Sequence, residues 1–207
     1  LGDVYKRQDL GMPTGTEFLD LISPQYVSDL VCWGAIGART AESQVHRELT
    51  SGLSCPIGIK NSTKGDIQIA IDAIKSAQYQ HVFLGTTKKG KVAIFKTSGN
   101  DDTHIILRGG LEPNYHPKDI ENCRADLEKN EVNANIMVDF SHGNSQKNHE
   151  NQKKVSASIC DQIASGNKDI IGVMIESHLK EGNQKISEDM EYGKSVTDAC
   201  VDWEETK

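Results

Sequence analysis

The stretch "NIMVDFSHGNS", residues 135–145, decides how this chain folds. It begins as an apolar run and then ends abruptly in Asp139, Ser141 and His142. A nearly continuous apolar run is typical of a strand in a parallel sheet, because helices cover both faces of such a sheet. The polar ending raises the question whether other strands of the chain finish in the same way.

Five further apolar runs have this character, and helical segments alternate with them. The six runs span residues 16–21, 31–39, 55–61, 104–110, 135–142 and 170–178. Apolar side chains recur at helical spacing in residues 65–78, 117–130 and 150–166. Strands that alternate with helices predict a parallel sheet. Residues 81–96 instead place two apolar runs around a polar turn with Gly90, which predicts an inserted β-hairpin.

Charged side chains end five of these runs, namely Arg39, Lys60, Arg108, His142 and Glu176. In a barrel of parallel strands, residues at the C-terminal ends of the strands form the active site. Positions 108, 142 and 176 lie 34 residues apart, about one strand–helix unit. We therefore predict an incomplete (β/α)8 barrel with about six of its eight strands. An open doubly wound sheet is the competing architecture.

The residue types at these ends indicate two kinds of site. Arg39, Lys60 and Arg108 are the cations that would bind a phosphate or a carboxylate; the alternative is a set of solvated surface charges. His142 and Glu176 are of the types that bind a divalent metal ion, and Asp198, which follows a loop after the last strand, could be a third ligand. An imidazole with carboxylates suits Mn²⁺, Fe²⁺, Co²⁺ or Zn²⁺, although a single histidine is more often a hydrogen-bonded structural residue.

Two glycines follow the third cation. Gly109 and Gly110 come directly after Arg108. Glycine lets another group approach the backbone closely, so the pair indicates either a substrate beside the chain or a tight turn.

Composition excludes several classes of partner. The 207 residues carry a net charge of -7 and no basic block, which argues against a general nucleic-acid or membrane-surface binder. No apolar run approaches the ~20 residues of a membrane span. The five cysteines show no CxxC spacing and fit a reducing compartment. We expect a cytoplasmic protein.

The two ends suggest a fragment. Residues 1–8, "LGDVYKRQ", form no periodic element, and we expect them to be a non-native remnant ahead of a catalytic domain at 9–207. The last ten residues, "DACVDWEETK", stop where a helix begins.

Longer motifs then resemble a known family. They are "WGAIGART", "SQVHREL", "HIILRGG", "DFSH", "GVMIESHL" and "YGKSVTDAC". From residue 9 to the C-terminus the chain resembles class I DAHP synthase (3-deoxy-D-arabino-heptulosonate 7-phosphate synthase) of enteric bacteria and fungi. This resemblance implies a metal-dependent (β/α)8 barrel that condenses phosphoenolpyruvate with erythrose 4-phosphate, the first step of the shikimate pathway of aromatic amino acid biosynthesis. It also implies a homo-oligomer when the protein is complete.

The resemblance implies roles for the residues at the strand ends. The phosphoenolpyruvate ligands would be Ala38, Arg39, Lys60 and Arg108, with Lys60 on the carboxylate. The metal ligands would be His142, Glu176 and Asp198. Catalysis would involve Lys60, His142 and Glu17, whose carboxylate would help to position water.

The chain also departs from the family's pattern. The fourth metal ligand, a cysteine in a "GPCS"-like strand, has no counterpart, nor has the "KPRT"-like strand that supplies a lysine and arginines. We expect these 207 residues alone not to catalyse the condensation. The alternatives are a non-catalytic effector-binding or oligomer-forming fragment, and the sister reaction on arabinose 5-phosphate. The segment "SQVHREL" and the hairpin argue against the second.

The hairpin at 81–96 resembles the family's regulatory insertion. The pocket for a feedback amino acid would be formed by Pro24, Gln25, Leu53, Ser54, Phe83, Gly85 and Phe95. The resemblance implies a preference for tyrosine over phenylalanine, because tyrosine-sensitive members of the family tend to carry glycine at the position of Gly85 and phenylalanine-sensitive ones serine; glycine leaves room for the phenol oxygen. The alternative is a structural hairpin without a ligand.

Overall fold

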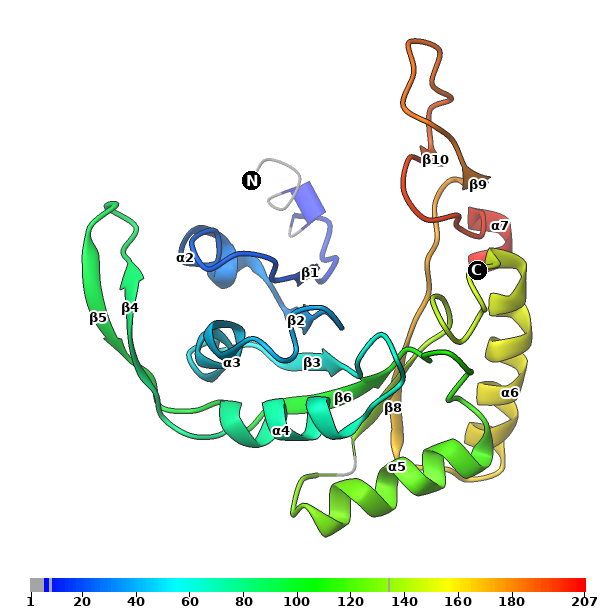
Figure 1. Cartoon of the computed structure of the whole chain (residues 1–207). Helices are drawn as coiled ribbons and strands as arrows, with labels where there is room; N and C mark the ends of the chain where they lie inside the picture. The colour runs from blue at the N-terminus through cyan, green and yellow to red at the C-terminus, as the bar shows by residue number, and fades with distance from the viewer. Residues whose placement is uncertain (1–5, 8, 134) are drawn as a thin grey trace. The chain divides into compact units, whose positions relative to one another are not determined.

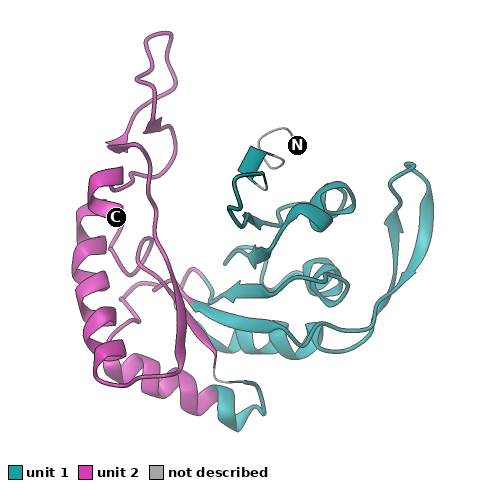
Figure 2. Ribbon diagram, turned by 180° about the vertical axis from the view of Figure 1, so that it is seen from behind, with its two compact units in different colours: residues 1–62, 66–106, 127–134 teal, residues 63–65, 107–126, 135–207 magenta. Residues whose placement is uncertain are grey.

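The computed structural model describes residues 6–7, 9–133 and 135–207. Most of the expected remnant at 1–8 therefore lies outside the described residues. The chain divides into two compact units, shown in Figure 2. Unit 1 comprises residues 1–62, 66–106 and 127–134, and unit 2 comprises residues 63–65, 107–126 and 135–207.

Unit 1 is built on parallel strands. In order across the sheet these are β1 (Gly15–Glu17), β2 (Trp33–Ile36), β3 (Ile57–Lys60) and β6 (Thr103–Leu107). The last residue of β6, Leu107, belongs to unit 2. In β3, Gly58 pairs with Ala35 on one side and with His104 on the other. Every residue of β3 and β6 is buried, as the continuous apolar runs predict for a parallel sheet.

Two helices of unit 1 contact each other, α3 (Gln44–Ser51) and α4 (Gln68–Ala77) (Figure 1). The buried face of α4 consists of Ala70, Ile71, Ala73, Ile74 and Ala77, and confirms the predicted helix. The sequence did not reveal α3, because its buried residues are His46, Leu49, Thr50 and Ser51, of which only Leu49 is aliphatic. Earlier in the chain, α2 (Pro24–Val27) and the 3-10 helix η1 (Ser28–Leu30) are single turns.

The hairpin predicted at 81–96 is present in unit 1. Strands β4 (Val82–Thr86) and β5 (Val92–Lys96) pair in antiparallel fashion around a turn in which Gly90 has φ +70°. Phe83 lies opposite Phe95, and their rings stack with centroids 6.0 Å apart. The alternate side chains on the other face are exposed, namely Val82, Leu84, Val92 and Ile94.

Unit 2 contains the other two predicted strands, β7 (Ile136–Asp139) and β8 (Ile170–Met174), which pair in parallel. Its long helices are α5 (Pro117–Lys129), whose last three residues belong to unit 1, and α6 (Gln152–Ala164), which follows the 3-10 helix η2 (His149–Asn151). Short strands β9 (Lys180–Asn183) and β10 (Lys194–Ser195) pair before the final turn α7 (Trp203–Thr206).

An isolated parallel bridge in unit 2 joins Ser177 to Val201. The segment that carries Asp198 therefore runs beside the chain that leaves β8. No apolar run of the sequence marks this pairing, so it is a feature of the folded chain alone.

The predicted strands exist, but most are shorter than their apolar runs. Arg39 and His142 each lie three residues past a strand end, Glu176 lies two past and Arg108 one past, whereas Lys60 is the last residue of β3. The expectation that each charged residue directly follows its strand is thus wrong for three of the five. Backbone pairing ends earlier than the apolar sequence does, and loops carry those side chains.

No helix among the described residues combines the length and the apolar character that crossing a bilayer requires.

His104 is a buried polar residue of β6 in unit 1. Only 5 % of the surface of His104 is exposed, and its Nε2 accepts a hydrogen bond of 3.2 Å from Trp33 Nε1. Burial lowers the pKa of His104 from 6.5 to about 4, because the interior disfavours the charged imidazolium. Protonation of His104 Nε2 would also remove the lone pair that accepts the hydrogen bond from Trp33.

We predict that the free energy of unfolding falls on acidification because of His104. The His104 imidazole takes up a proton at a pKa near 6.5 in the unfolded chain and only near 4 in the folded chain. The contribution of this residue to the free energy of unfolding is therefore complete above pH 6.5 and is lost as the pH falls toward 4. Between about pH 7.5 and about pH 4.5 this contribution is roughly 2–3 kcal/mol. Urea denaturation at both pH values measures it. The variant His104→Gln should lose that part of the pH dependence, and an identical slope in both proteins would contradict the assignment.

Candidate metal centre

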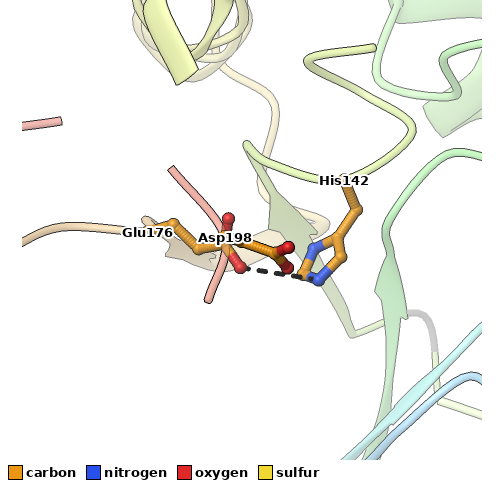
Figure 3. Close-up of side chains that lie close together, drawn as sticks. All are labelled: His142, Glu176 and Asp198. Atoms are coloured by element: carbon orange, nitrogen blue, oxygen red, sulfur yellow. Dashed lines mark ion pairs between the residues drawn. The ribbon is translucent and has the colours of Figure 1, made fainter. Parts of the chain in front are cut away.

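Three side chains of unit 2 converge, as Figure 3 shows. They are His142 from the loop after β7, Glu176 from the chain after β8, and Asp198. One ligand atom from each lies within 4.8 Å of the others, and His142 Nε2 is 3.6 Å from Glu176 Oε1. Residues that are 34 and 22 positions apart in the sequence thus present an imidazole and two carboxylates to one point.

Asp139 determines how the imidazole is presented. It is the last residue of β7 and is fully buried, with Oδ2 2.8 Å from His142 Nδ1. Its Oδ1 accepts hydrogen bonds from the backbone N–H and the hydroxyl of Ser141, at 2.9 and 2.8 Å. A carboxylate beside Nδ1 favours the tautomer with the proton on Nδ1, so the lone pair of Nε2 is directed to the Glu176 side.

The backbone at His142 is unusual. This residue has φ +54°, in the left-handed region that non-glycine residues rarely adopt. Such a conformation persists only when the surrounding contacts enforce it, and it is frequent at functional sites. The contacts of Asp139 with Ser141 and His142 supply that constraint.

The charges of the cluster oppose one another. Burial raises the pKa of the Glu176 carboxyl, and the carboxylates of Asp198 and Asp139 raise it further. The nearby His142 and the Ser141 side chain act in the opposite direction. A divalent cation among these groups would relieve the repulsion between the carboxylates.

The residues present fit a metal ion. With bonds of about 2.1 Å, two ligand atoms of one ion lie at most about 4.2 Å apart. Here His142 Nε2 and Glu176 Oε1 are 3.6 Å apart, and all three ligand atoms lie within 4.8 Å of one another. An imidazole and carboxylates are a donor set for Mn²⁺, Fe²⁺, Co²⁺ or Zn²⁺. The imidazole is already oriented by Asp139, which is the usual arrangement for a ligating histidine.

A cavity of about 380 Å³ in unit 2 contains this cluster. Arg108 and Lys147 also line it. The sequence predicted Arg108 beside the metal ligands, whereas it gave no reason to single out Lys147. Fixed cations and a metal-type cluster in one cavity favour an anionic ligand.

The other predicted phosphoenolpyruvate residues belong to unit 1. Lys60 is buried, with 7 % of its surface exposed, Ala38 is half-buried and Arg39 is exposed. The carboxylate of Glu17 lies against Gly37, the residue before Ala38, in the space that a Cβ there would occupy. The structure therefore brings Glu17 to the loop of Ala38 and Arg39.

The glycines after Arg108 contact protein backbone. A Cβ on Gly109, which has φ +72°, would lie 2.5 Å from the backbone of Gly143 and Asn144. A Cβ on Gly110 would lie 2.4 Å from the backbone of Lys64 and Gly65. Neighbouring loops therefore occupy the space that a side chain at either position would need.

A separate cavity of about 710 Å³ lies in unit 1, between the hairpin and α2–α3. Of the seven predicted effector residues, six line it, namely Pro24, Gln25, Leu53, Phe83, Gly85 and Phe95. Ser54 does not line it.

Sequence reasoning gave no role to three polar residues near the cluster. Asp139 was visible as a carboxylate at a strand end, whereas Asn144 and Gln152 looked like ordinary loop and helix residues. Asn144 is 3 % exposed and donates to the carbonyls of Leu107 and Asp139 at 3.1 and 2.8 Å. Such hydrogen bonds between a side chain and distant backbone groups become visible only in the folded chain.

Parallel strands with metal-type ligands and cations gathered beyond their C-terminal ends place the chain among α/β proteins of barrel type. The family model described as "DAHP synthetase I family" matches residues 4–207, and the chain belongs to this family.

Named relatives agree with this membership. The chain is 58 % identical over 200 residues to the "Phospho-2-dehydro-3-deoxyheptonate aldolase, Phe-sensitive" of Escherichia coli strain K12, covering 96 % of this chain and 57 % of that protein. It is 51 % identical over 201 residues to the Trp-sensitive aldolase of the same strain, covering 96 % and 58 %. The structure of the aldolase from Francisella tularensis SCHU S4 superimposes with a TM-score of 0.95 at 56 % identity, covering 98 % of this chain and 60 % of that one. The chain thus spans less than two thirds of the length of these relatives.

We predict that Gly109→Ala destabilises the protein more than Gly90→Ala. Both glycines have φ near +70°, so each substitution carries a similar backbone cost of about 1 kcal/mol. A Cβ at 90 meets open space, whereas a Cβ at 109 overlaps backbone atoms. That overlap adds roughly 1–3 kcal/mol. Chemical denaturation of the two variants compares the costs, and equal losses would show that the loop of residues 143–144 yields easily.

Proposed function

We propose that the whole protein condenses phosphoenolpyruvate with erythrose 4-phosphate to DAHP and inorganic phosphate, on a complete (β/α)8 barrel. The observation that carries this proposal is the cluster of His142, Glu176 and Asp198 in one cavity with Arg108. Family membership supplies the reaction, and the cluster supplies a place for its chemistry. In the reaction, C3 of phosphoenolpyruvate attacks the aldehyde carbon, water adds at C2 and phosphate leaves.

The cations of the chain bind the anionic groups of the substrate. Arg108 presents a planar guanidinium, which binds a phosphate through two parallel hydrogen bonds and stabilises the charge that develops on the leaving phosphate. In unit 1, the proposal assigns the same phosphate to Arg39 and the Ala38 backbone, and the carboxylate to Lys60. Family membership alone supports those three assignments. Glu17 is proposed to position the attacking water.

A divalent ion, one of Mn²⁺, Fe²⁺, Co²⁺ or Zn²⁺, would be held by His142, Glu176 and Asp198. When bound it supplies Lewis-acid polarisation of the aldehyde oxygen. Asp139 keeps the proton on His142 Nδ1, so that Nε2 offers its lone pair. The cavity wall from Arg108 to Asp198 keeps the substrate next to these groups.

We predict that the 207-residue chain binds Mn²⁺ and that His142→Ala weakens this binding at least about 10-fold, because one of three ligands is lost. Isothermal calorimetry measures the affinity. His116→Ala is the control, since His116 is an exposed histidine of unit 2 that does not line the cavity. In the complete protein, His142→Ala should abolish heptulosonate formation. Equal Mn²⁺ affinity of the two variants would remove His142 from the metal site.

A second function, binding of a feedback amino acid, is favoured by the cavity in unit 1. Its volume of about 710 Å³ exceeds that of an aromatic amino acid, and the stacked rings of Phe83 and Phe95 give it an apolar wall. Glu48, Lys96 and Gln25 also line it, and these can bind an ammonium or a carboxylate group. Two relatives are named Phe-sensitive and Trp-sensitive. For this chain we propose tyrosine as the feedback amino acid.

We predict that tyrosine binds more tightly than phenylalanine and that Gly85→Ser reverses the order. A Cβ at position 85 would lie 2.9 Å from the Phe95 ring, so a serine there takes up space beside the aromatic wall. Calorimetry with both amino acids tests this, with Lys89→Ser in the exposed hairpin turn as the control. Tighter binding of phenylalanine to the unchanged chain would refute the preference.

A further inference from the structure

Gln152 supports the cluster through hydrogen bonds to the backbone of Glu176, not through contact with its carboxylate. It is the first residue of α6 and only 2 % exposed. Its Oε1 accepts a hydrogen bond of 2.9 Å from the Glu176 N–H, and its Nε2 donates one of 3.0 Å to the Glu176 carbonyl. One side-chain amide therefore satisfies both peptide groups of a residue that carries a cluster carboxylate.

The position of Glu176 explains why such a contact matters. Strand β8 ends at Met174, so the sheet does not fix the peptide groups of Glu176. The Glu176 carbonyl also accepts a hydrogen bond of 3.1 Å from the N–H of Val201, three residues after Asp198. The two segments that carry the carboxylates thus meet at this carbonyl, and Gln152 holds it from the side of α6.

Few side chains could replace this amide. Glutamine provides a donor and an acceptor without charge, whereas lysine lacks an acceptor, and an ionised glutamate lacks a donor. Asparagine carries the same groups on a side chain one methylene shorter. An uncharged group also avoids adding a negative charge beside Glu176, Asp198 and Asp139.

We propose that Gln152 is a positioning residue that sets the placement of the Glu176 and Asp198 carboxylates, and through it the affinity and geometry of the metal site. This inference rests on the proposed metal-binding function of the cluster. Residues that support metal ligands from behind typically change metal affinity about 10- to 100-fold when they are substituted.

The test compares two buried glutamines of the same helix. Gln152→Met removes the contact with Glu176 and keeps side-chain length and helix propensity. Gln162→Met is the matched control: Gln162 is 8 % exposed, donates to the Tyr115 carbonyl at 2.9 Å and does not line the cluster cavity. Both variants of the full 207-residue chain are titrated with Mn²⁺, and the visible absorption of each is recorded at saturating Co²⁺, because that spectrum reports the arrangement of the ligands.

We expect Gln152→Met to bind Mn²⁺ about 10- to 100-fold more weakly than the unchanged chain, and to show a changed Co²⁺ spectrum. Gln162→Met should match the unchanged chain in both measurements, even where its thermal stability falls. Should Gln152→Met fail to fold, Gln152→Asn decides, since it keeps both polar groups but does not reach Glu176.

The outcomes separate this inference from the proposed function. An unchanged chain that binds neither Mn²⁺ nor Co²⁺ overturns the proposed metal site, and the role of Gln152 with it. An unchanged chain that binds metal while Gln152 variants bind equally well, with the same Co²⁺ spectrum, overturns the role of Gln152 alone. Equal weakening in Gln152→Met and Gln162→Met also overturns it, because loss of helix stability would then explain both.

Discussion

The buried carboxylate of Asp139 is the interaction on which the candidate centre depends. A fully buried charge is tolerated only when hydrogen bonds and a partner satisfy it, and here Ser141 and His142 do so. The same contacts enforce the left-handed backbone at His142 and select its tautomer. Because the loop is ordered by a charge at the strand end, the imidazole is oriented before any ligand arrives.

Much of the fold could be predicted from the sequence, for a physical reason. Strands buried on both faces leave continuous apolar runs, and α4 and α6 leave apolar periodicity, so both survive in the sequence. Residue type also revealed His142 and Glu176 as candidates, since imidazole and carboxylate side chains after apolar runs are chemically distinctive, and it added Asp198 from a later loop. Their convergence within 4.8 Å is a matter of geometry that spacing alone suggested only loosely.

What the sequence could not reveal depends on contacts between distant residues. Helix α3 buries mainly hydroxyl and imidazole side chains, with Leu49 as its one buried aliphatic residue. Gln152 is an ordinary polar residue until its partner 24 positions away is known. The glycines at 109 and 110 were recognised as sites of close approach, but only the folded loops show that the neighbour is backbone.

The hairpin of unit 1 shows how a turn can control a distant surface. Its pleat alternates, so the stacked rings of Phe83 and Phe95 lie on one face and line the cavity. Leu84, which also borders the cavity, and Ile94 are exposed on the other face. A slip of one residue in the strand pairing would exchange the two sets. The register is set at the tip, where Thr87 and Lys91 pair and Gly90 donates to the Thr87 carbonyl at 2.8 Å. Insertion of a single residue there would turn the aromatic wall outward and replace it with aliphatic side chains, although no residue of the cavity itself had changed.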